Sequence, residues 1–175
     1  MTAEGGRGTP GILIALDVLI IQRADEPHAL DDAALALRRI GWMGRPIILV
    51  GETVAGRSLP AGKKGRERWV RGELGAGAYS VVPFDEHDAP RQEEAAVGTW
   101  TDLQTANDAG WLVTDRARDV AAARKAGLKT IVVGPPDPQP LHHRPDYRAR
   151  DLRDAVGHLL AVDVFSDRAG LTMFG

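Results

Sequence analysis

The chain has 175 residues, a formal net charge of −2, 43% hydrophobic residues and 26% charged residues. This length suits one domain with a substantial core, and the small net charge gives no general attraction to nucleic acid or to an anionic membrane. The chain has no cysteine, which excludes disulfides and cysteine-ligated zinc and favours a reducing, cytoplasmic location.

The first ten residues are polar and rich in glycine, so we expect a flexible N-terminus over residues 1–10. The apolar run that follows, residues 12–21, is interrupted by Asp17 and is too short to span a bilayer. Within it, residues 12–16 are apolar and rich in β-branched side chains. This composition predicts a strand that is covered on both faces.

Apolar runs and helical periodicities then alternate along the chain. Residues 85–99 are acidic and weakly periodic, which indicates a loop with a candidate helix. The alternation predicts an α/β fold, a doubly wound three-layer sandwich around a mainly parallel central sheet. Helices are predicted over residues 30–40, 63–74, 101–109, 119–126 and 152–162, and further strands over residues 46–50, 78–82, 111–114 and 129–133.

Candidate site residues follow the predicted strands, because ligands of an open parallel sheet gather beyond the carboxyl ends of its strands. Asp17 follows the first strand, and Asp115 follows the strand over residues 111–114. If those two strands are neighbours, the two carboxylates lie at the same edge of the sheet. We therefore expect the strands that contain Ile14 and Leu112 to be adjacent.

Residues 111–133 carry the most specific pattern in the chain. A strand ends in Asp115, a second aspartate, Asp119, comes four residues later, and a helix, Gly127 and another strand complete the unit. This segment resembles the fourth motif of the haloacid dehalogenase (HAD) superfamily, and residues 145–156 resemble the segment that closes many domains of that family. The resemblance implies a Rossmann-like HAD domain over residues 11–162 without an inserted cap, followed by a C-terminal tail over residues 163–175.

The first motif of that family departs from its usual form here. In the family, the first strand ends in an Asp-x-Asp pair, in which the first aspartate attacks phosphorus and the second transfers a proton. The chain has Asp17 alone, and two alignments are open. If Asp17 is the catalytic nucleophile, which its place after five apolar residues favours, Leu19 stands at the acid position. If Asp17 is the acid, Ala15 stands at the nucleophile position.

The resemblance also implies a Mg²⁺ ion held by oxygen ligands. In the first alignment these ligands are the Asp17 carboxylate, the backbone carbonyl of Leu19 and the Asp115 carboxylate, with Asp119 close by. A metal site can therefore persist where proton transfer has been lost.

The phosphate-binding positions match the family less well. The second motif usually has Ser or Thr directly after its strand, where this chain has Gly51, with Thr53 two residues later. Arg91 is the candidate for the lysine of the third motif, although an arginine does not reproduce the geometry of a lysine.

The missing carboxylate favours a HAD-fold protein with impaired phosphatase motifs, which works as a binding or regulatory subunit for a phosphorylated ligand or a protein partner and can form homo-oligomers. The alternative is an active capless HAD hydrolase, a phosphatase or a dehalogenase-like enzyme, with Asp17 as nucleophile. An unrelated doubly wound fold is the third interpretation. The basic residues within 63–71 are expected to form a solvated helix face, and His142 and His143 an exposed part of a loop.

Overall fold

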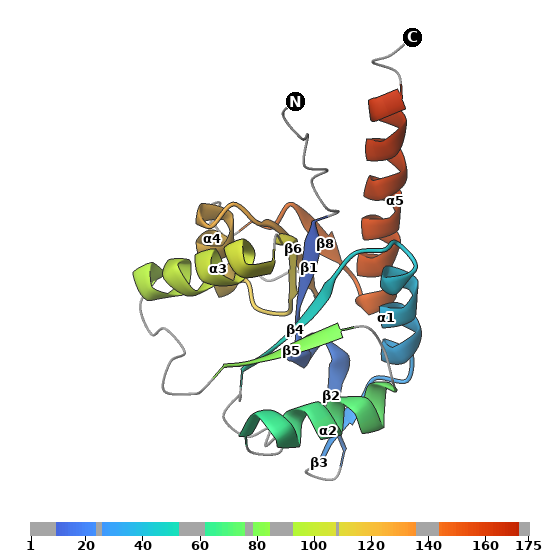
Figure 1. The fold of residues 1–175 in the computed structure, drawn as a ribbon, viewed down its shortest axis with the longest axis vertical. Helices are drawn as coiled ribbons and strands as arrows, with labels where there is room; N and C mark the ends of the chain where they lie inside the picture. Colours follow the sequence, from blue (N-terminus) through green and yellow to red (C-terminus); the bar gives the residue numbers. More distant parts are fainter. Residues whose placement is uncertain are drawn as a thin grey trace, which may run out of the picture.

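A six-stranded sheet forms the centre of the computed structural model, which describes residues 10–23, 26–52, 62–75, 79–84, 93–107, 109–135 and 144–171. The strand order is β5-β4-β1-β6-β7-β8, and every pair of neighbours is parallel (Figure 1). The predicted doubly wound α/β architecture is therefore confirmed. The strands are β1 (Gly11–Ala15), β4 (Ile47–Glu52), β5 (Tyr79–Phe84), β6 (Ala109–Thr114), β7 (Lys129–Val133) and β8 (Tyr147–Ala149).

Helices cover both faces of this sheet. Figure 1 shows α3 (Glu93–Asn107) and α4 (Arg118–Lys125) together on one side, with α1 (Ala33–Gly41) and α5 (Leu152–Leu171) packed together on the other. The helix α2 (Gly62–Leu74) also contributes to the core on the side of α1 and α5. None of the described helices is long and apolar enough to cross a membrane.

Each face of the sheet packs against its helices in a separate hydrophobic core. Ile12 and Ile14 of β1 belong to the core that includes α1, α2 and α5, whereas Leu13 between them belongs to the core with α3 and α4. All three side chains are fully buried. Successive residues of a strand point to opposite faces, so a strand covered on both sides reads as an uninterrupted apolar run.

The connectivity places the candidate site. From β1 the chain builds outward to β4 and β5, and it then returns to the other side of β1 to build β6, β7 and β8. Ile14 is paired with Val113, so the strands that contain Ile14 and Leu112 are adjacent, as predicted. The boundary between β1 and β6 is therefore the switch point of the sheet, where open α/β folds bind their ligands.

The segment after β1 differs from the prediction. The strand ends at Ala15, one residue earlier than expected, and continues into a 3-10 turn, η1 (Leu16–Leu19). A two-stranded antiparallel sheet follows, formed by β2 (Ile20–Arg23) and β3 (Glu26–Ala29). The residues of the turn are buried like those of the strand, so the apolar pattern of the sequence did not show where the strand ends and the turn begins.

Other elements differ from the prediction as well. Helix α3 begins at Glu93, eight residues before the predicted start at residue 101, and β8 was not predicted. Helix α5 continues to Leu171, beyond the predicted end at residue 162, because the intervening sequence has no proline and has glycine only at position 170. Residues 1–9 and 172–175, which belong to the expected N-terminus and tail, lie outside the described residues.

Candidate active site

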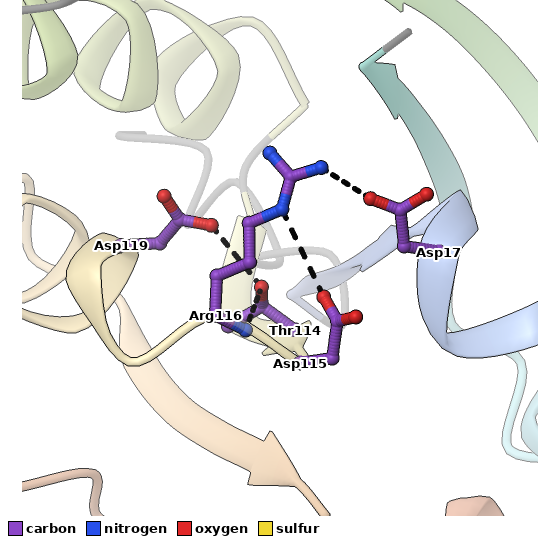
Figure 2. Close-up of polar contacts among 5 residues, drawn as sticks. All are labelled: Asp17, Thr114, Asp115, Arg116 and Asp119. Carbon is purple, nitrogen blue, oxygen red and sulfur yellow. Dashed lines mark hydrogen bonds and ion pairs between the residues drawn. The ribbon is translucent and has the colours of Figure 1, made fainter. Parts of the chain in front are cut away.

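The site forms where two neighbouring strands end. Asp17 is the second residue of η1, immediately after β1, and Asp115 and Arg116 follow the last residue of β6. Since β1 and β6 are parallel neighbours, these residues meet at the same edge of the sheet (Figure 2). The predicted approach of Asp17 and Asp115 is thus present in the structure.

Arg116 connects the two carboxylates. Its guanidinium donates a hydrogen bond from Nη2 to Oδ2 of Asp17, and its Nε lies 3.9 Å from Oδ1 of Asp115. The Asp17 side chain is only 7% exposed and the Arg116 side chain 16%, whereas that of Asp115 is 38% exposed. The contact between Arg116 and Asp17 is therefore a largely buried, charge-assisted hydrogen bond, and the contact with Asp115 is looser and faces water.

A second set of contacts fixes the loop that carries Arg116. The buried hydroxyl of Thr114 donates a hydrogen bond to Oδ2 of Asp119 at 3.1 Å, and it accepts one from the backbone N–H of Arg116 at 3.1 Å. Asp119 lies in the first turn of α4, where a carboxylate also interacts favourably with the helix dipole. Asp119 therefore supports the shape of the loop, a role that is separate from any metal contact.

Leu19 is more deeply buried than Asp17. Its side chain is fully buried, and its carbonyl oxygen accepts a hydrogen bond from the backbone N–H of Leu30 at 2.8 Å, at the base of the β2–β3 hairpin. The carbonyl thus already has one partner. Among the described residues there is no group of three or more His, Asp or Glu side chains that could hold a metal ion.

The proposed phosphate-binding residues can be followed only in part. Gly51 lies within β4, paired with Pro83 of β5, and so does not follow the strand as predicted. It does lie at the carboxyl end of the strand next to β1, close to the edge that holds Asp17. Thr53, Arg91, His142 and His143 lie outside the described residues.

Arg116 is the site residue that the sequence reasoning missed. The signal was a basic residue directly after the aspartate that ends β6. Its guanidinium contacts the carboxylates of Asp17 and Asp115, whereas Asp119 contacts the Thr114 hydroxyl (Figure 2). An anionic ligand at this edge would need additional positive charge.

Comparison with known proteins agrees with this architecture. Residues 85–155 match the model of a family described as HAD-hydrolase-like. No curated protein matches the sequence.

Solved structures share the fold at low sequence identity. A D,D-heptose 1,7-bisphosphate phosphatase from B. bronchiseptica, complexed with magnesium and phosphate, has a TM-score of 0.60 and 18% identity over 87% of this chain and 99% of that one. A putative HAD-like phosphatase from Mesorhizobium loti has a TM-score of 0.58 and 18% identity, covering 88% and 85% of the two chains. An L-2-haloacid dehalogenase has a TM-score of 0.58 and 18% identity, but this chain spans only 58% of it. Residues 85–155 are thus similar to the HAD-hydrolase-like family, and the chain shares the fold of these HAD-like structures.

Proposed function

We propose that this chain binds a phosphorylated ligand at the edge between β1 and β6 and hydrolyses it poorly or not at all, as a binding or regulatory member of the superfamily. One observation carries the proposal. The turn after β1 offers a single carboxylate, Asp17, and Arg116 already occupies it. The phosphorylated group can belong to a small molecule or to a protein partner, and the absence of cysteine favours a cytoplasmic setting.

The end of β1 can be aligned with the first motif of the family in two ways. In one alignment, Ala15 at the end of β1 stands where the family has its nucleophile, and Asp17 stands at the acid position within η1. The methyl group of Ala15 cannot attack phosphorus. In the other alignment the acid position is held by Leu19, whose fully buried alkyl side chain cannot transfer a proton. Either way, one of the two groups that share the reaction is absent.

The contact with Arg116 supports low activity as well. A carboxylate must direct a lone pair at phosphorus or at a proton in order to act. In the structure, Oδ2 of Asp17 accepts a hydrogen bond from the guanidinium instead. The ground state is thus stabilised in an arrangement that is unsuited to attack.

A divalent cation is part of the proposal. Asp17 and Asp115 both lie next to one positive group, and proteins commonly hold Mg²⁺ with one or two carboxylates completed by water and phosphate, which supports a shared site at these two residues. When bound, the ion would supply positive charge to the oxygens of a phosphate. The magnesium and phosphate in the complex from B. bronchiseptica are consistent with this expectation for the fold.

The alternative is an active capless hydrolase with Asp17 as the nucleophile. The observation in its favour is the location of Asp17 at the switch point, beside Asp115. This hypothesis requires Arg116 to leave Asp17 and an acid to come from the substrate, from water or from another residue.

Restoring the missing carboxylate distinguishes the alignments. If Asp17 is at the acid position, Ala15→Asp should raise Mg²⁺-dependent turnover of both an aryl and an alkyl phosphate, because it supplies a nucleophile. Leu19→Asp should instead lower the thermal midpoint without raising turnover, because it places a charge in a fully buried position.

The double variant Ala15→Asp/Asp17→Asn serves as the control. It keeps the new nucleophile and removes the acid, so turnover of the alkyl phosphate should drop by about 10²–10⁴-fold from that of Ala15→Asp. Turnover of the aryl phosphate, whose leaving group needs no proton, should drop less. A gain with Leu19→Asp and none with Ala15→Asp would instead support Asp17 as the nucleophile.

A further inference from the structure

The guanidinium of Arg116 lies where a cation shared by Asp17 and Asp115 would lie. Figure 2 shows the Arg116 side chain extending between the two carboxylates, which come from different strands. Its contact with Asp17 is buried and its contact with Asp115 is not. Arg116 therefore neutralises the carboxylate that water reaches least.

The guanidinium and a divalent cation cannot both lie between the two carboxylates. Mg²⁺ binds oxygens directly at about 2.0–2.1 Å, so an ion shared by Asp17 and Asp115 would need the space that the guanidinium now fills. Two positive groups next to each other also repel strongly where water is largely excluded. Binding of one group therefore requires release of the other.

The backbone of the loop that carries Arg116 has hydrogen bonds that do not depend on the guanidinium. The backbone N–H of Arg116 is bonded to Oγ1 of Thr114, and the Thr114 hydroxyl is bonded to Asp119 at the start of α4. None of these contacts involves the guanidinium. Rotation of the Arg116 side chain toward the more exposed carboxylate would thus leave the loop and the helix in place.

We propose that Arg116 is an internal competitor of the divalent cation: it holds Asp17 in the metal-free protein and must leave before the cation binds. This inference rests on the metal site of the proposed function. Only the fraction of molecules with Arg116 released is competent to bind the ion, so the apparent affinity is reduced by that fraction. The chain thereby stabilises its own metal-free state.

The test compares the full chain with Arg116→Gln. In EDTA, the thermal midpoint of Arg116→Gln should lie several degrees below that of the unmodified protein, because Asp17 is left buried without its partner. Addition of Mg²⁺ should raise the midpoint of Arg116→Gln more than that of the unmodified protein. Titration calorimetry with Mg²⁺ should give an affinity at least about tenfold higher for Arg116→Gln.

Two further variants keep the test decisive. Arg124→Gln removes one exposed positive charge near the C-terminal end of α4, and its response to Mg²⁺ should equal that of the unmodified protein. Arg116→Lys keeps the positive charge but loses the planar guanidinium. Its affinity for Mg²⁺ should therefore lie between that of the unmodified protein and that of Arg116→Gln. If Arg116→Gln does not fold in EDTA, folding restored by Mg²⁺, or a higher Mg²⁺ affinity of Arg116→Lys than of the unmodified protein, supports the inference.

Two outcomes overturn it, and they are distinguishable. Equal Mg²⁺ affinity in the unmodified protein, Arg116→Lys and Arg116→Gln would remove the competition but leave the metal site. No binding of Mg²⁺ by any variant would remove the proposed metal site together with the competition.

Discussion

At the level of single residues, the largely buried carboxylate of Asp17 has Arg116 as its charged partner. Carboxylates are seldom as buried as that of Asp17 without a partner of opposite charge or several hydrogen bonds. Arg116 provides the opposite charge and one hydrogen bond. Loss of the partner is expected to be more harmful than loss of the pair, because a lone buried charge has no compensation.

The opposite end of the sheet holds a second group of interacting side chains. His158 of α5 stacks on the ring of Tyr147, with centroids 3.8 Å apart and an interplanar angle of 3°, and it meets the edge of Trp111 at 5.8 Å. Lys129 lies over Trp111 at 5.4 Å, and Asp154 accepts a hydrogen bond from the Tyr147 hydroxyl at 3.0 Å. These contacts attach α5 to the amino ends of β6, β7 and β8.

This stack predicts a pH dependence of stability. Burial holds the pKa of His158 below its ordinary value of 6.5, and the nearby Asp154 carboxylate only partly offsets that effect. The unfolded chain therefore gains a proton at a pH where the folded chain still resists it. The free energy of unfolding should fall as the pH drops through about 6.5, and the fall should end below the pKa of the folded state.

Urea unfolding between about pH 5 and pH 8 measures this dependence. His158→Phe keeps a ring in the stack and removes the titrating group, so its stability should vary less over that range. Titration of Asp154 does not contribute to the change in stability between about pH 5 and pH 8. Its pKa is held below 3.8, chiefly by the hydrogen bond from the Arg150 backbone, so its contribution is lost only at lower pH. Equal slopes for His158→Phe and the unmodified protein would contradict the assignment.

At the scale of elements, the end of α4 shows how glycine defines a boundary. Gly127 has a φ of 84°, and its N–H donates to the carbonyl of Arg124 while that of Leu128 donates to the carbonyl of Ala123. This left-handed conformation suits glycine and is strained for other residues. The same substitution should therefore have opposite effects at this position and inside a helix.

We predict that Gly127→Ala destabilises the protein by about 1 kcal/mol, because alanine strains the left-handed backbone. Gly157→Ala is the matched control, since Gly157 is exposed inside α5 and an added methyl group meets nothing within 4 Å. It should stabilise the protein by about 0.5–1 kcal/mol. Chemical unfolding measures both values. A stabilising Gly127→Ala would show that the turn does not require its left-handed conformation.

Local signals explain which elements were predictable. The strand over residues 129–133 was predicted with its observed bounds, and α4 to within one residue at each end, because Gly127 and the apolar run after it mark the boundaries. The turn η1 and the β2–β3 hairpin were missed, since their burial comes from packing distant in sequence. Ala29 of the hairpin, for example, donates its backbone N–H to Glu73 of α2, 44 residues away.

At the scale of the whole molecule, topology brings the site together. The two halves of the sheet meet between β1 and β6, and this places Asp17 beside a segment almost one hundred residues away in sequence, with a separation of 99 between Asp17 and Arg116. The sequence was sufficient to predict that Asp17 and Asp115 share an edge, because parallel strands end on the same side. It was not sufficient to predict that Arg116 joins them, since a side-chain contact across two strands depends on the register of the complete fold.

Turnover of phosphate monoesters is the most direct test of the central claim that this fold has kept a ligand site without efficient hydrolysis. The unmodified protein and Asp17→Asn should be assayed with an aryl phosphate in millimolar Mg²⁺ and in EDTA. We predict slow turnover that neither Mg²⁺ nor Asp17→Asn changes substantially, because a single carboxylate held by Arg116 cannot carry both steps of the reaction. Rapid Mg²⁺-dependent turnover that Asp17→Asn abolishes would contradict the account and identify the chain as an active hydrolase.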